Sequence, residues 1–96
     1  TIARVQAAVA QHFGIKVIAL KGPRRDTEVI RPRQIAFYLC RELTAFSLPV
    51  IADHFGGRDH TTALHGARKI KRLLPYDADL AFDVALLFEK ITGTLQ

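Results

Sequence analysis

The sequence lacks several features that would place it in common protein classes. Its single cysteine, Cys40, excludes a disulfide framework and a paired-cysteine metal site, and it suits a reducing compartment, so we expect a cytoplasmic protein. No stretch approaches the roughly 18 consecutive apolar residues of a membrane span. Polar residues interrupt the first apolar segment, so no secretory signal is predicted. Methionine is absent even at position 1, which suggests an excised fragment.

Catalytic and cofactor motifs are also missing. The chain has no glycine-rich loop followed by Lys and Ser/Thr, so we expect no bound nucleotide. A nucleophile or metal set can be assembled on paper, but the spacing argues against it: His60 and His65 are five residues apart, about 140° around a helix. We therefore expect no metal, no cofactor and no enzyme activity. The residues weighed for such a set are His54, His60, His65, Asp53, Asp59, Ser47 and Cys40.

Charge is distributed unevenly along the chain. The net charge is +5, yet residues 16–33 and residues 58–72 each carry +4, whereas residues 76–96 carry −3. This asymmetry favours a polyanion bound to one face of the protein. The alternative is that the basic runs are only solvated helix faces.

Hydrophobic spacing predicts helices and no strands. An amphipathic helix over residues 2–13 ends at Gly14, and a short helix or turn around residues 17–20 closes at Gly22-Pro23. Residues 23–28 are expected to be an exposed basic loop. A helix is predicted from Pro32 to about Thr44, with Phe37 and Tyr38 at the margins of its buried face.

A helix-turn-helix is predicted in the second half of the chain. Ser47 is a candidate N-cap for a short helix with Pro49 in its first turn, and Gly56-Gly57 suits a turn with positive φ. The next helix should run from about Asp59 to Leu74 and stop at Pro75. A last helix is expected from about Asp79 to Thr92, followed by Gly93. The predicted fold is all-α, one compact helical bundle forming a single domain over residues 1–96.

The first turn of the second helix of this predicted helix-turn-helix carries groups that can recognise DNA bases. In a major groove an aspartate accepts from cytosine N4, a histidine donates or accepts, and a threonine methyl meets the thymine methyl. Asp59, His60 and Thr61 supply these three groups. Two alternatives remain open: Asp59 as a helix N-cap, and His60 as an ordinary exposed histidine.

The order and spacing of these motifs resemble a known family. Arg31-Pro32-Arg33-Gln34, Ser47-Leu48-Pro49 and the string from Phe55 to Thr62 are similar to the C-terminal DNA-binding domain of the bacterial replication initiator DnaA, over roughly residues 1–92. The resemblance implies a Trp-repressor-like helix-turn-helix that binds double-stranded DNA at the nine-base-pair DnaA box. It also implies a role in chromosomal replication and a monomer at each site.

The resemblance implies a role for each site residue. Contacts to bases are expected from Asp59, His60 and Thr61, from Pro49 near a thymine methyl, and from Arg25 in an A·T-rich minor groove, where Arg24 could assist. Contacts to the DNA backbone are expected from Arg33 and Gln34 at a helix start, and from Leu48, Arg58, Thr62, Arg68 and Lys69. Arg58 should also support the turn. A solvated role remains open for Arg25, Arg68 and Lys69, and a core or capping role remains open for Leu48 and Pro49.

The chain departs from the family pattern at several positions. Val50 replaces an acidic residue, Ala52 a glycine and Pro23 a basic residue, while Ala63 and Gly66 replace larger residues in the recognition helix. A mid-helix glycine costs roughly 1 kcal/mol relative to alanine, so we expect a slightly loose helix. An alternative function therefore stays open, a stand-alone DnaA-like regulator of transcription or replication with altered DNA specificity or acting through protein partners.

Overall fold

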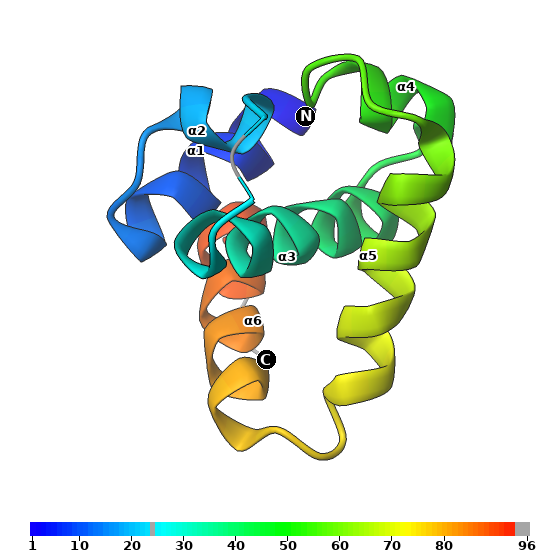
Figure 1. Cartoon of the computed structure of the whole chain (residues 1–96). Coiled ribbons are helices and arrows are strands. Elements are labelled where there is room, and N and C mark those ends of the chain that lie inside the picture. The colour runs from blue at the N-terminus through cyan, green and yellow to red at the C-terminus, as the bar shows by residue number, and fades with distance from the viewer. Residues whose placement is uncertain (24, 94–96) are drawn as a thin grey trace.

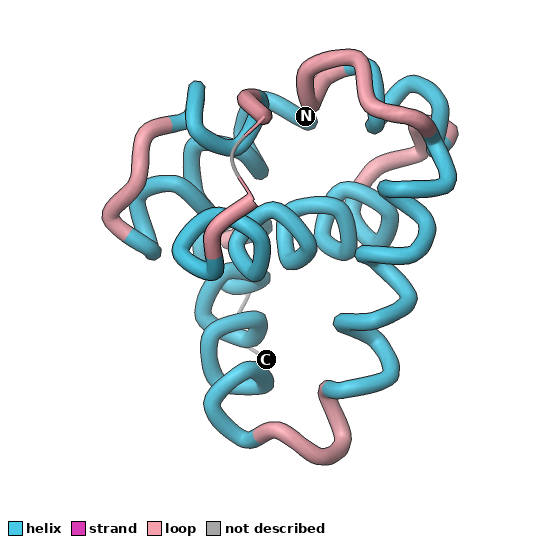
Figure 2. Tube along the Cα trace, viewed as in Figure 1, coloured by secondary structure: helices cyan, strands magenta, loops and turns pink. Residues whose placement is uncertain are grey.

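The computed structural model describes residues 1–23 and 25–93, and this part of the chain folds into helices without strands (Figures 1 and 2). The helices are α1 (Ile2–Phe13), α2 (Val17–Lys21), α3 (Thr27–Leu43), α4 (Leu48–Asp53), α5 (His60–Leu73) and α6 (Ala78–Thr92). The expected all-α bundle with a helix-turn-helix is confirmed. Arg24, which was considered for a minor-groove contact, lies outside the described residues.

The central helix α3 organises the others. It packs against α5 and also contacts α1, α2 and α4, while α6 packs against α1 (Figure 1). Its fully buried residues include Ile35, Leu39 and Cys40. The wider core takes side chains from the remaining helices, among them Val5, Val9, Leu20, Ile51, Ala67, Ile70 and Leu87.

Two aromatic rings join α3 to the helix-turn-helix. Phe37 of α3 and Phe55, which directly precedes the two turn glycines, pack edge to face with ring centroids 4.8 Å apart. Phe37 is 2% exposed, so its predicted position at the margin of the helix is wrong. Burying a phenylalanine contributes roughly 1.5–3 kcal/mol, and this pair therefore fixes the turn against the centre of the molecule.

Helix α3 begins five residues before the predicted start at Pro32. Asp26 is extended at the N-cap position and Glu28 lies in the first turn, where a negative charge meets the helix dipole favourably. Pro32 stands inside the helix and is buried, although proline has no N–H to donate to the helix ladder. Because Thr27 and Glu28 are helical, the exposed loop is shorter than predicted, and Arg33 and Gln34 do not open a helix.

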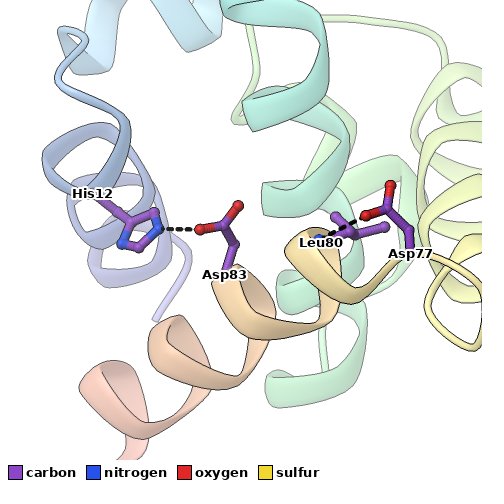
Figure 3. Close-up of polar contacts among 4 residues, drawn as sticks. All are labelled: His12, Asp77, Leu80 and Asp83. Carbon is purple, nitrogen blue, oxygen red and sulfur yellow. Dashed lines mark hydrogen bonds and ion pairs between the residues drawn. The ribbon is translucent and has the colours of Figure 1, made fainter.

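The other helix ends follow their predicted signals. Gly14 and Gly93 cap α1 and α6 in the left-handed region, and Ser47 accepts from the backbone N–H of Val50 at the start of α4. Helix α5 ends at Leu73, ahead of Pro75. At the start of α6, Asp77 accepts from the backbone N–H of Leu80 at 3.0 Å (Figure 3).

Polar side chains tie α1 to α6 at several points along the two helices. His12 Nε2 lies 2.8 Å from Asp83 Oδ1, and Lys90 Nζ donates to Gln11 Oε1 at 2.5 Å (Figure 3 shows the first pair). Arg4 Nε donates to the carbonyl of Ile91 at 2.9 Å. These contacts join residues more than 70 positions apart, and they hold α6 against α1.

Gly66 allows α5 to approach α3 closely. A Cβ at this position would lie 2.9 Å from Phe37 Cδ2 and 3.3 Å from Gln34 Cγ, and Gly66 and Ala63 are both buried. The expectation that this glycine loosens the helix is therefore revised. A larger side chain at position 66 would push the two helices apart, and the helix propensity that glycine gives up is offset by close packing.

Candidate nucleic-acid interface

The turn before α5 is built from two glycines in the left-handed region. Gly56 and Gly57 have φ values of 82° and 72°. A Cβ on Gly56 would collide with the backbone carbonyl of Lys21, so this glycine also allows the turn to approach the end of α2. The backbone N–H groups of Gly57 and Arg58 donate to the carbonyls of Asp53 and Ala52. The turn therefore sets where α5 starts.

Asp59 caps α5 and connects the first residues of the helix. Its Oδ1 accepts from the backbone N–H of Thr61 at 2.8 Å and from the Thr61 hydroxyl at 2.7 Å, and it lies 3.6 Å from Nδ1 of His60. The capping role left open by the sequence is thus observed. It does not remove Asp59 from the surface, because 68% of the side chain is exposed.

The electrostatics of this cap keep Asp59 charged. The bonds from the Thr61 backbone and hydroxyl lower the pKa of the Asp59 carboxyl, and nearby His60 lowers it further. At neutral pH the carboxylate therefore only accepts hydrogen bonds. Because the Thr61 hydroxyl donates to Asp59, this side chain can offer a partner its γ-methyl and an acceptor oxygen, but no further donor. We call Asp59, His60 and Thr61 the exposed triad.

A groove lies beside the exposed triad, between the end of α2, the following loop, α3 and α5. It encloses about 770 Å³ and has no acidic side chain in its lining among the described residues. Its cationic and imidazole groups come from Lys21, Arg25, Arg33, Arg58, His65 and Lys69. We call this the basic groove. Such a surface attracts an anion along its whole length.

The residues of α5 that line the groove recur at the spacing of one helix face. Thr62, His65, Gly66 and Lys69 all line it, which is the spacing of one helix face. His65 was considered in the sequence only as a metal ligand and was rejected, so its place in the groove was missed. The sequence did carry a signal for this place: His65 lies three residues after Thr62 and four before Lys69, on the same predicted helix face.

The structure brings together only some of the expected contact residues. Arg25, Arg33, Gln34, Arg58, Thr62 and Lys69 line the basic groove. Arg68 is exposed but lies outside that lining. Leu48 and Pro49 are in the first turn of α4, half-buried and exposed respectively, and they are also outside the lining.

Arg33 and Arg58 use their guanidinium groups inside the molecule. Arg33 is 6% exposed, and its Nε donates to the Leu20 carbonyl at 2.8 Å. Arg58 donates to the carbonyl of Phe55, which confirms the expected support of the turn. Burial is the main cause that lowers the pKa of Arg33 to about 10, followed by the charge of Arg58, and both guanidinium groups stay protonated at neutral pH.

Residues that could hold a metal do not gather in the described part of the chain. No group of three or more His, Cys, Asp or Glu side chains is close enough for that purpose there. Cys40 is buried in the core, which raises the pKa of its thiol to about 12. Among the described residues, no helix has the length and apolar character needed to cross a membrane.

Comparison with known proteins decides the family. The model of the bacterial DnaA protein helix-turn-helix matches residues 2–70, which include α1 to most of α5. The chain belongs to this DnaA helix-turn-helix family. The matched residues include the glycine turn and the exposed triad.

Full-length relatives agree with this assignment. Over 87 residues the chain is 49% identical to the chromosomal replication initiator protein DnaA of two strains of Cereibacter sphaeroides, ATCC 17029 and ATCC 17023. It is 45% identical over 87 residues to the same initiator from Ruegeria sp. strain TM1040. Each alignment covers 91% of this chain but only 18–19% of the relative. The chain thus spans about a fifth of the length of these DnaA proteins.

Proposed function

We propose that this DnaA-family chain binds double-stranded DNA sequence-specifically at sites resembling the DnaA box, and that it serves the initiation or regulation of chromosomal replication in the cytoplasm. The observation that carries the proposal is the basic groove beside the exposed triad. Acid-free positive surface attracts the phosphate backbone, and the adjacent polar side chains can distinguish base edges. We propose one domain over residues 1–96, bound as a monomer at each site.

The proposed docking places the start of α5 in the major groove. Asp59 would accept from a cytosine amino group through its second carboxylate oxygen, Oδ2, because Oδ1 already accepts from Thr61. His60 offers a ring nitrogen, and Thr61 offers its methyl to a thymine. Pro49, exposed on α4, would contact a thymine methyl at the edge of the interface next to α4.

The proposed contacts to the DNA backbone lie around the exposed triad and come from two groups of residues. Thr62, His65 and Lys69 line the basic groove from α5, and Gln34 lines it from α3, so these four side chains would face one phosphate strand. Leu48 on α4 and Arg68 on α5 would contact phosphates at the edges of the interface. Arg25, exposed in the loop after α2, would enter the adjacent minor groove.

A binding titration tests the proposal. Fluorescence anisotropy at physiological salt should compare labelled duplexes carrying TTATNCACA or a scrambled sequence, together with a single strand. We expect the box to bind about 10³-fold more tightly than the scrambled duplex. With four to six phosphate contacts, log K should fall against log salt with a slope near −4 to −5. Equal affinity for the box and scrambled duplexes would overturn the proposal.

A further inference from the structure

The short helix α2 ends in carbonyl groups that have no partner within the helix, as at any helix C-terminus. Arg33 of α3 supplies several of the missing donors. Its Nε donates to the Leu20 carbonyl at 2.8 Å, and its Nη2 donates to the carbonyls of Ala19 at 3.0 Å and Gly22 at 3.1 Å. The planar fork of one guanidinium therefore holds the end of α2 against α3.

Arg58 binds the same segment from the helix-turn-helix. Its Nη1 donates to the Lys21 carbonyl at 3.2 Å, and its Nη2 donates to the Gly22 carbonyl, which it shares with Arg33. The same side chain donates to the Phe55 carbonyl just before the glycine turn. Gly56 adds a backbone contact here, since a Cβ would strike the Lys21 carbonyl. We call Arg33 and Arg58 the arginine clasp.

The clasp lies directly before the loop that carries Arg25. Gly22 before this loop is held by both arginines, and Asp26 after it is the N-cap residue of α3. Arg25 itself is exposed and lines the basic groove opposite α5. Arg58 thus joins the residue before this loop, Gly22, to the residue before the glycine turn, Phe55.

We propose that Arg33 and Arg58 are positioning residues that fix the Arg25 loop relative to the start of α5, so that the minor-groove and major-groove contacts are made in register. Arg33 is assigned this role in place of the phosphate contact expected from the sequence, because its guanidinium is turned onto carbonyl groups. The proposal rests on the proposed function, and it adds that recognition by Arg25 depends on two arginines that need not touch the DNA.

A double-mutant cycle tests the proposal with the intact chain and the labelled box duplex. Arg33→Lys keeps the charge but lacks the fork that bonds three carbonyls. We expect Arg25→Ala to weaken box binding about 10- to 100-fold and Arg33→Lys to weaken it about 10-fold. In the Arg25→Ala background, Arg33→Lys should weaken binding by less than about 2-fold, because the positioned group is already gone. An equal loss of affinity from Arg33→Lys with and without Arg25 would overturn the proposal.

Lys69→Ala is the matched control. Lys69 lines the same groove from α5, and no hydrogen bond within the described chain engages it, so its loss should multiply with Arg25→Ala. Thermal unfolding of each variant shows whether it is folded at the assay temperature. If Arg33→Lys is unfolded there, Arg58→Lys takes its place, and a loss at least about 3-fold larger with Arg25 present than without it supports the proposal. An equal loss in the two backgrounds contradicts it.

The binding measurements also distinguish failure of the proposed function from failure of the positioning role. Equal binding of the unaltered chain to box and scrambled duplexes would overturn the proposed function alone. Coupling between Arg33 and Arg25 would then be measured on the scrambled duplex, where a minor groove and phosphates are still present. Coupling there would retain the positioning role, and its absence would end it.

Discussion

The two sides of the molecule are stabilised by different kinds of polar contact. Beside the basic groove, Arg33, Arg58 and Asp59 bond mainly to backbone groups, which fixes the path of the chain at the turn and loop. At the α1–α6 side, His12 pairs with Asp83 and Lys90 with Gln11 through side chains (Figure 3 shows the first pair), while Arg4 bonds the Ile91 carbonyl. Phe82 on α6 is 65% exposed. The difference indicates that backbone geometry is specified on the side where we propose that DNA binds, whereas α6 is held mainly as a packed helix.

The largest effect is expected from Gly56→Ala. This change forces a side chain into a positive-φ position and against the Lys21 carbonyl, so we expect it to lower the free energy of unfolding by about 3 kcal/mol. Gly57→Ala and Gly93→Ala share the positive φ but would have open space around the Cβ, and each should lower it by only about 1 kcal/mol. Urea unfolding measures all three. Similar losses of unfolding free energy at the three sites would contradict the close approach of the turn to α2.

The next effect concerns the two γ groups of Thr61. Thr61→Ser keeps the hydroxyl bonded to Asp59 but removes the methyl, so discrimination at one thymine should fall by about 1–3 kcal/mol. Thr61→Val keeps a methyl and removes the hydroxyl, so selectivity should be lost instead at the cytosine contacted by Asp59. Titration against duplexes with single base-pair changes separates the two outcomes. If both variants lose selectivity at the same base pair, the division of roles is wrong.

A smaller effect separates the lysines of the two sides. Lys69→Ala removes a cation from the basic groove, so it should weaken box and scrambled duplexes alike and make the salt slope shallower by about 0.9. Lys90→Ala removes a cation that bonds Gln11 on the α1–α6 side, and the slope should not change. Binding measured from low to physiological salt provides both slopes. An equal change in the two variants would place DNA on both sides.

The smallest effect is expected at the pair shown in Figure 3. Asp83→Ala removes the partner of His12, and because the contact is partly exposed, the free energy of unfolding should fall by only about 0.5 kcal/mol. Box affinity should stay within about 2-fold of the unaltered chain. Chemical denaturation and the anisotropy titration measure the two quantities. A large loss of affinity with little loss of stability would mean that α6 takes part in binding.

Local signals in the sequence predicted most of the fold. Gly14, Ser47, Gly56-Gly57 and Pro75 each act within one or two turns, and the structure has the expected cap, turn or helix end at every one of them. The early start of α3 was missed because Pro32 was interpreted as a helix start, whereas it is buried inside the helix, after its first turn.

The candidate site was less predictable, because its geometry depends on contacts between distant segments. The triad was recognisable from its order in the chain. The role of Arg33 and the contacts of Arg58 with the end of α2 were not, since these carbonyl partners lie 11 to 37 residues away in sequence. Gly66 likewise has meaning only when Phe37 is packed against it.

The most direct test of the account is to map the DNA-binding side by NMR. Backbone amide shifts of the isotope-labelled chain should be followed while the box duplex is added. We predict large changes at residues 21–25 and 56–69 and small changes along 80–91 on α6. Large changes along α6, with the residues around the glycine turn unaffected, would contradict the claim that the basic groove and the exposed triad recognise DNA.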